Sequence, residues 1–234
     1  GAAFLFQESD SQSLFVLLLH HIITDGWSVD QLLHELSAEY EGRRVNPPQA
    51  RFIELAAQQR ALLAGSSLCD SEEFFRQQLS GAPATSEIVP ERPRPATASL
   101  QGRLHAATLP ASLRQQLLTL AQSEGVTLST LLFSGLFALL HRYTGQRDLV
   151  IGMPYASRDL PGSDAVQGPL LNLLPIRVQI PSATSFRDLL RSVRSQTHSA
   201  YRHSALPFSR VRSLLSLQHE TSRHPLFQIA YAPQ

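Results

Sequence analysis

The sequence contains no lysine, one cysteine, one methionine and one tryptophan among its 234 residues. The single cysteine, Cys69, excludes an internal disulfide framework and fits a reducing compartment, so we expect a cytoplasmic location. No apolar run is long enough to cross a bilayer, and no basic-then-apolar signal begins the chain. We therefore expect no membrane contact.

Basic residues are scarce early in the chain, and acidic residues are scarce late. Residues 1–102 carry 7 Arg against 13 acids, a balance of −6, and residues 160–234 carry 8 Arg against 3 acids, a balance of +5. The later segment could attract an acidic partner, but its arginines alternate with apolar helix positions, which is typical of a solvated helix face. Since there is no aromatic stripe and no recognisable motif, we expect no nucleic acid binding.

The most informative stretch runs from His20 to Ser28 and reads His-His-Ile-Ile-Thr-Asp-Gly-Trp-Ser. The apolar run before it, Leu14–Leu19, predicts a strand buried on both faces. The helical spacing after it predicts a helix that Ser28 caps, with Gln31 in a capping box. The two histidines therefore lie at a strand end and Asp25 lies just before a helix, where α/β proteins usually present reacting groups.

Simpler interpretations of this stretch exist. A histidine at a strand end is usually a satisfied polar group, and an acid before a helix is usually a cap. HxxxD alone would favour that interpretation, but the full string fixes two histidines, Asp, Gly, Trp and Ser at one spacing. We expect no metal site, because no glutamate and third histidine complete a zinc pattern nearby and Cys69 is isolated.

Predicted helices and strands alternate along the rest of the chain, which favours an α/β fold. The patterns predict helices over 52–63, 70–79, 110–122, 127–143 and 185–201, and strands over 103–109, 148–153, 168–179 and 226–231. Helix 127–143 has almost no polar face and should be buried, helix 70–79 should begin with a capping box of Asp70 and Glu73, and Pro175 should break its strand. The proline-rich segment Gly81–Ser99 predicts an extended crossing segment.

The stretch at His20 matches HHxxxDG and resembles the core motif of condensation domains of nonribosomal peptide synthetases. Four later strings resemble further segments of that family in the same order: Val150–Arg158 (IGxPxAxR), Gly168–Arg177 (GxxxNTLxxR), His203–Phe208 (HxxLPF) and His224–Gln228. Because the order agrees over nearly the whole chain, the chain is identified as a member of this family. It departs from the usual pattern at Leu173, Ala205 and Ser209, which affects substrate and docking details rather than the class.

The resemblance implies an α/β fold of two lobes, each like a chloramphenicol acetyltransferase subunit, that form a V-shaped pseudodimer. Family members are considerably longer, so we expect both lobes to be incomplete here. Residues 1–95 would be the later part of the N-terminal lobe with the HHxxxDG motif, and residues 96–234 the first part of the C-terminal lobe. Expressed alone, such an internal piece should be poorly soluble and inactive.

The resemblance also implies amide bond formation between two carrier-bound aminoacyl or peptidyl thioesters. His21 would be the catalytic residue, either as a general base or as a group that orients the amine and stabilises the tetrahedral intermediate. Asp25 would support the motif through a bidentate ion pair with Arg158.

Five further residues have weaker assignments. We expect His20 to be a packed, hydrogen-bonded core histidine, and Gly26 either to let another backbone approach closely or to be an ordinary turn glycine. Trp27, Ser28 and Asn172 are expected along the substrate channel. Trp27 could instead cover the helix start, and Asn172 could cap a strand end.

The resemblance implies that the chain binds no cofactor itself. The phosphopantetheine arms of donor and acceptor peptidyl carrier domains would deliver the substrates, and an adenylation domain would lie in the same polypeptide. Three alternatives stay open: a noncatalytic carrier-docking scaffold, which would normally have lost His21; an epimerisation domain, which shares HHxxxD but differs after it; and a coenzyme A-dependent acyltransferase, which would not match the later strings.

Overall fold

The computed structural model describes residues 1–48, 50–83, 85, 88, 95–99, 101–217 and 221–233. Its internal contacts divide the chain into two compact units. Unit 1 comprises residues 1–67 and 156–171, and unit 2 comprises residues 68–155 and 172–234. The assignment of residues 1–95 and 96–234 to two lobes stays a prediction. Much of the predicted crossing segment Gly81–Ser99, including Pro90 and Pro93, lies outside the described residues.

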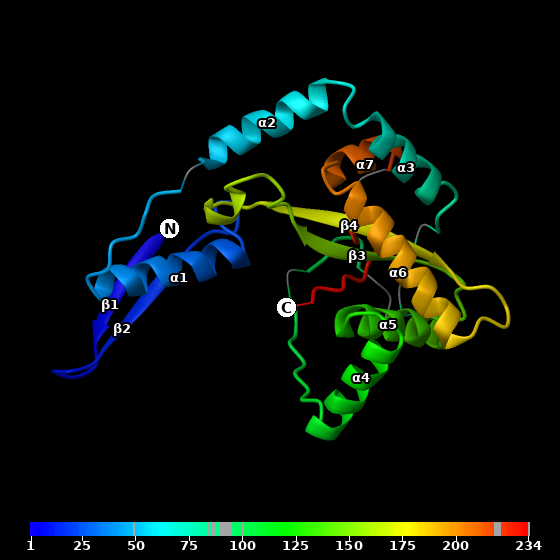
Figure 1. Ribbon diagram of the computed structural model, residues 1–234, viewed down its shortest axis with the longest axis horizontal. Coiled ribbons are helices and arrows are strands. Elements are labelled where there is room, and N and C mark those ends of the chain that lie inside the picture. Colours follow the sequence, from blue (N-terminus) through cyan, green and yellow to red (C-terminus); the bar gives the residue numbers. More distant parts are fainter. Residues whose placement is uncertain are drawn as a thin grey trace. The chain divides into compact units, whose positions relative to one another are not determined.

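Unit 1 begins with a hairpin of β1 (Ala2–Gln7) and β2 (Ser13–Leu18), which pair antiparallel from Ala2 opposite Leu18 to Gln7 opposite Ser13 (Figure 1). Leu14 and Leu18 of β2 are 49% and 59% exposed. The prediction of a strand buried on both faces is therefore wrong. Within the described residues only β1 pairs with β2, and a two-stranded ribbon leaves most of its apolar side chains in solvent.

Two helices, α1 (Gly26–Tyr40) and α2 (Phe52–Ala64), complete the first part of unit 1. Asp25 caps α1, because its carboxylate accepts a hydrogen bond from the Ser28 amide at 2.8 Å. The predicted Ser28 cap is therefore wrong, and Ser28 lies buried in the first turn. Helix α1 is followed by Gly42, which adopts the left-handed conformation with φ +74° that commonly ends a helix.

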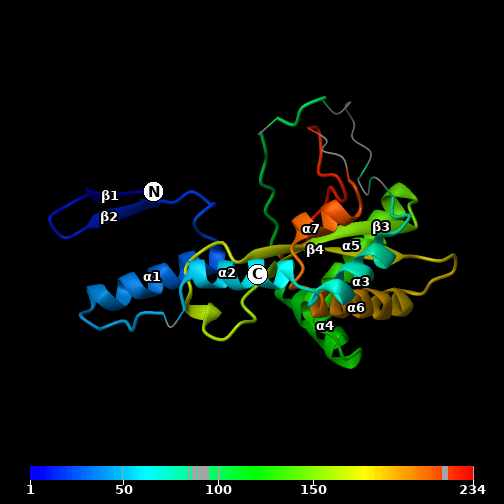
Figure 2. The same ribbon diagram turned by 90° about the horizontal axis from the view of Figure 1, so that it is seen from above.

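Unit 2 is built on β3 (Asp148–Ala156) and β4 (Leu171–Gln179), which form a two-stranded sheet. Its helices are α3 (Cys69–Leu79), α4 (Ala111–Ser123), α5 (Leu128–Thr144), α6 (Phe186–Arg202) and α7 (Phe208–Leu214). Helix α6 passes along one face of the sheet, in contact with α5, and α3 contacts α7 (Figure 2).

The core of unit 2 confirms that α5 is a central helix. Phe133, Phe137 and Leu140 are at most 2% exposed and pack with the fully buried run Leu149–Ile151 of β3. The burial of α5 is not complete all round, since Leu139 is 54% exposed.

Several element predictions for unit 2 need correction. Residues 103–109 form no strand, and residues 226–231 contribute only an isolated parallel bridge between Gly152 and Ala230. Pro175 does not break β4, which runs from Leu171 to Gln179 and pairs with β3 alone among the described strands. Proline is tolerated in such an edge strand. Helix α3 begins after Leu68 with no side-chain cap, so the capping box predicted there is absent.

Among the described residues, no single helix has both the length and the apolar content of a membrane span. Helices α4 and α5 would satisfy those two criteria only as a pair, and they are bent by 100° with respect to each other.

His203 connects α3 to the turn before α7. Its Nδ1 lies 3.0 Å from the Ser71 hydroxyl, and its ring stacks on Phe74 at a centroid distance of 4.2 Å. Burial lowers the pKa of His203, the charge of Arg202 lowers it further, and Asp70 opposes them. Burial also lowers the pKa of His224. Both imidazoles are thus held neutral more strongly in the folded chain than in the unfolded one.

Acid should therefore weaken unit 2. The unfolded chain takes up protons on these histidines near pH 6.5, whereas the folded chain does so only at lower pH. The stabilisation that comes from the two neutral histidines should be fully present above that pH. It should be lost as the pH drops through their folded pKa values, so the free energy of unfolding should fall. His203→Asn should flatten this dependence between pH 7.5 and pH 5, measured by denaturant unfolding. The exposed control His105→Asn should not, and equal slopes for both variants would contradict the assignment.

Candidate functional site

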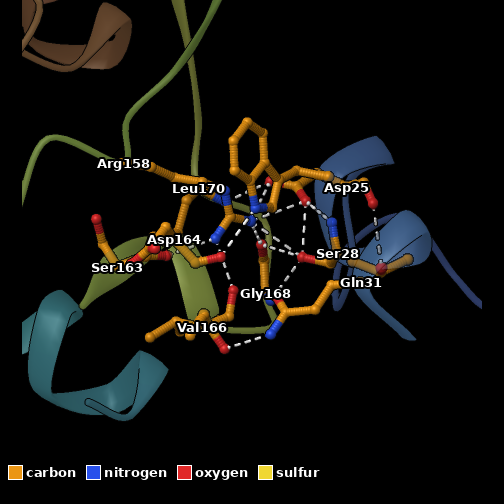
Figure 3. A network of polar contacts seen from close by, with 12 residues as sticks. Asp25, Ser28, Gln31, Arg158, Ser163, Asp164, Val166, Gly168 and Leu170 are labelled. Carbon is orange, nitrogen blue, oxygen red and sulfur yellow. Dashed lines mark hydrogen bonds and ion pairs between the residues drawn. The ribbon is translucent and has the colours of Figure 1, made fainter. Parts of the chain in front are cut away.

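An ion pair between Asp25 and Arg158 lies at the centre of unit 1 (Figure 3). One guanidinium nitrogen, Nη2, donates to both carboxylate oxygens at 3.0 and 3.1 Å, and the two side chains are only 7% and 4% exposed. The predicted pair across 133 positions is confirmed. Its geometry differs from a two-nitrogen fork, because Nη1 instead donates to the carbonyls of Ser163 and Val166 at 2.8 and 2.6 Å.

Ser28 joins this pair to the loop of residues 156–171. Its hydroxyl lies 2.7 Å from the Asp25 carboxylate, and it accepts hydrogen bonds from Arg158 Nη2 at 3.1 Å and from the Gly168 amide at 2.9 Å. Ser28 is only 2% exposed, so its hydroxyl lies inside the protein. Ser28 is thus a buried connector within the network, and its place along a substrate channel stays a prediction.

The same face of α1 holds the loop at several points. The Trp27 indole donates to the Asp164 carbonyl at 2.9 Å, and the Gln31 amide donates to the Ala165 carbonyl at 2.8 Å (Figure 3). Farther along the loop, the Leu170 amide donates to Asp25 at 3.0 Å. These contacts are spread over loop residues 164 to 170. The residues that follow the histidines, Asp25, Trp27 and Gln31, therefore hold the loop along most of this stretch.

The charge of Asp25 is maintained by this environment. Burial by itself would raise the pKa of the carboxyl, but the hydroxyl and amide of Ser28, the charge of Arg158 and the Leu170 amide together hold its pKa below the ordinary value. Asp25 is therefore an anion and a structural anchor near neutral pH, rather than a proton donor.

Gly168 contacts two members of this network through its backbone: its amide donates to the Ser28 hydroxyl, and its carbonyl accepts from Arg158. Its φ is +151°, and a methyl group added to it would come within 2.3 Å of the Phe52 ring. This glycine begins the GxxxNTLxxR string, but the string gives no reason for a glycine there. Its use of a backbone region reserved for glycine was not readable from one sequence.

Gly168→Ala should lower the free energy of unfolding by roughly 1–3 kcal/mol, because alanine is strained at this φ and collides with Phe52. Denaturant unfolding measures the loss. Phe52→Ala removes the ring but leaves the backbone strain. In the Phe52→Ala background, Gly168→Ala should therefore lower the free energy of unfolding by a smaller amount, but still by more than zero. An unchanged midpoint for Gly168→Ala would contradict this description.

The two histidines lie directly after β2, and Asp25 lies directly before α1, as predicted. His21 is exposed, and within the described residues its imidazole has no hydrogen-bond partner. His20 is exposed as well, and its Nδ1 accepts from the Ile22 amide at 3.0 Å. The prediction of a packed core histidine at 20 is therefore wrong. The hydrogen bond exists, but it only closes the local turn.

Gly26 and Trp27 flank the network on the solvent side. A methyl group on Gly26 would meet nothing within 4 Å, so no described part of the chain approaches this glycine closely. The Trp27 ring lies 5.5 Å from the Arg158 guanidinium carbon and is 50% exposed. It covers the ion pair at the helix start, which was the alternative to a place in the channel.

Asn172 lies in unit 2 and is saturated there. Its amide donates to the carbonyls of Ser204 and Leu206, both at 2.8 Å, and its oxygen accepts from the amides of Leu173 and Phe208. Both amide hydrogens are used in these bonds, as expected for the strand-end anchor that was the alternative. The contribution of Asn172 to a substrate channel stays a prediction.

Arg177, the last residue of the GxxxNTLxxR string, is a second connecting arginine. It donates to both oxygens of Asp148 at 2.8 and 2.6 Å and to the carbonyls of Gln78, Ser80 and Gly81. It therefore fixes the end of α3 to β4. No group of three or more His, Cys, Asp or Glu side chains suited to a metal ion occurs in the described part of the chain.

The chain is similar to known proteins over nearly its whole length. The family model of the condensation domain matches residues 2–232. Malpinin synthetase from Mortierella alpina is 34% identical over 99% of this chain. Phosphinothricin tripeptide synthetase PhsC from Streptomyces viridochromogenes is 34% identical over 97% of it. The chain spans 3% of the first relative and 22% of the second.

Solved structures agree with the sequence matches. The X-domain from teicoplanin biosynthesis superposes with a TM-score of 0.89 at 27% identity, over 98% of this chain and 53% of that one. A four-domain nonribosomal peptide synthetase bound to AMP and glycine gives a TM-score of 0.90 at 25% identity, over 98% of this chain and 18% of that one. The α/β fold is therefore that of condensation domain structures, and the chain is a partial domain.

Proposed function

Because the chain belongs to the condensation domain family, we propose that it forms amide bonds in nonribosomal peptide synthesis. The observation that carries the proposal is the Asp25–Arg158–Ser28 network. It holds the start of α1, directly after the turn that carries the histidines, while the His21 imidazole is exposed and has no hydrogen-bond partner within the described residues. A base or an orienting donor in acyl transfer needs an imidazole that is held in place and whose ring nitrogens are not used in structural hydrogen bonds.

The reaction would join an acceptor amine to a donor thioester. The amine nitrogen attacks the thioester carbonyl, a tetrahedral intermediate forms, and its collapse breaks the carbon–sulfur bond and releases a thiol. A proton must leave the nitrogen and one must reach the sulfur. The His21 imidazole is suited to accept the first of these protons or to orient the amine by a hydrogen bond.

The partners follow from the same proposal. Donor and acceptor peptidyl carrier domains would present their substrates as thioesters on phosphopantetheine arms, and an adenylation domain would lie in the same polypeptide. The chain itself would hold no cofactor and would act in the cytoplasm. The names of the relatives, which are synthetases, support this setting.

A docking role is the second candidate, and one comparison favours it. The X-domain that superposes on this chain has also been solved in complex with OxyB, with a TM-score of 0.88 at 27% identity. A domain of this fold can therefore serve as a binding surface for another protein.

The test is a single-turnover assay of the intact protein with loaded donor and acceptor carriers. Appearance of a dipeptide on the acceptor carrier supports condensation. Inversion of the donor stereocentre without a new amide would indicate epimerisation, and acyl transfer from coenzyme A would indicate the third alternative. Carrier binding with none of these products would overturn the proposed chemistry in favour of docking.

A further inference from the structure

Unit 2 contains a cavity of about 420 Å³ that is separate from the motif network. It lies where α5 ends and α6 begins, and its volume falls in the usual range for small-ligand pockets. Its walls come from the last turns of α5, from Arg147 before β3, and from residues 180–186 between β4 and α6.

The charged groups of the lining are cationic. Arg142 and Arg147 are exposed, and within the described residues neither forms an ion pair with an acid, nor is any lining residue acidic. Arg147 donates to the Ser182 hydroxyl at 2.7 Å through Nη1. Within the described residues, the other guanidinium nitrogens of Arg147 remain available as donors to a ligand. Two guanidinium groups beside one cavity without a carboxylate favour an anion there.

His141 adds a third nitrogen. Its Nδ1 lies 2.7 Å from the Gln146 carbonyl oxygen, which can only accept. Nδ1 therefore carries the proton, and Nε2 is the nitrogen left for another partner. The contact also fixes the ring orientation at the cavity wall.

The apolar part of the lining consists of Ala138, Ile180, Pro181, Ala183, Phe186 and Leu189, and Ser182, Thr184 and Ser185 add hydroxyl-bearing residues. Phe186 is notable because helical spacing predicts that it points inward with Leu189, yet it is 44% exposed beside the cavity. An exposed aromatic ring next to two unpaired arginines suits a ligand with one charged end and one apolar end.

We propose that this cavity binds a small organic anion, a carboxylate or a phosphate ester, that carries a short apolar arm. The anionic head would lie at Arg142 and Arg147, and the arm would lie against Phe186. The site uses no residue of the HHxxxDG motif, so it is independent of the proposed condensation chemistry.

Saturation-transfer NMR and calorimetry on the intact protein test the proposal with phenyl phosphate and benzoate. Benzyl alcohol serves as the neutral probe and inorganic phosphate as the probe without an arm. Arg142→Gln with Arg147→Gln should weaken binding of the better aromatic anion at least tenfold. Arg114→Gln, an exposed arginine on α4 outside the cavity, is the matched control and should bind like the parent.

Further variants separate the effect of charge from an effect on folding, and the contribution of the apolar arm from that of the anionic head. The Arg142→Lys, Arg147→Lys pair should keep most of the affinity, and Phe186→Ala should weaken phenyl phosphate more than inorganic phosphate. His21→Ala should leave binding unchanged. Tighter binding of phenyl phosphate assigns a phosphate, and tighter binding of benzoate assigns a carboxylate. Equal affinity in the Gln pair and in Arg114→Gln, or binding of benzyl alcohol as tight as that of the anions, would overturn the proposal.

Discussion

His21→Ala should reduce the single-turnover rate of dipeptidyl-carrier formation by about 10²–10⁴-fold, the range for loss of a positioned acid–base group. The imidazole is exposed in the turn that precedes Asp25, whose carboxylate forms a buried pair with Arg158. No described group shares its hydrogen bonds, so its removal should not disturb the fold. The assay uses intact protein with both carriers loaded, and it compares rates of amide formation under saturating conditions.

Two controls make this result specific. His20→Ala removes only a local bond to the Ile22 amide and should have a much smaller effect on the rate. The midpoint of thermal unfolding of His21→Ala should equal that of the parent, which separates lost chemistry from lost structure. If the His21→Ala rate matched the parent, orientation by other groups would have to account for the reaction.

Asp25→Asn should lower the free energy of unfolding by about 3–5 kcal/mol, because it leaves the Arg158 charge buried without its counter-ion. Asparagine retains an oxygen for capping α1, so the loss isolates the charge rather than the cap. The condensation rate should fall as well, since the turn carrying His21 would lose its support. Denaturant unfolding of Asp25→Asn, Arg158→Gln and the double variant measures the coupling between the two side chains.

The matched control is the exposed pair Arg191–Asp188, whose side chains are 71% and 58% exposed. Asp188→Asn should cause no measurable loss of that kind, because solvent screens the charges. Should Asp25→Asn prove as mild as Asp188→Asn, the network would not be the support described here. A double variant no less stable than either single variant would instead confirm strong coupling.

The Asp25–Arg158 pair was foreseeable because two separate motif strings place an acid and an arginine at characteristic positions. The role of Ser28 was not. A serine before an apolar helical period is usually a cap, and what decides its role is Gly168, 140 positions away. Local preferences give way where a tertiary partner supplies more hydrogen bonds than the local alternative.

Burial was predicted well for α5 and poorly for β2. The apolar positions of α5 face neighbours that lie within the described residues, so pattern and burial agree. The pattern of β2 indicates a covered strand, yet its only described partner strand is β1. An apolar run indicates that a strand is suited to burial, but the run does not identify the part of the protein that covers the strand. Whether the isolated chain is soluble and active stays a prediction.

The insertion of residues 156–171 into unit 1 has a consequence for biosynthesis. At ordinary translation rates, the ribosome needs roughly 7–27 s to add the 133 residues between Asp25 and Arg158. Throughout that interval Asp25 and Ser28 have no Arg158 or Gly168 to bind. The turn bearing the histidines should therefore mature late, after α3 to α5 have emerged. Nascent chains stalled before residue 158 should show this turn as protease-sensitive, and chains stalled well beyond residue 171 should show it protected.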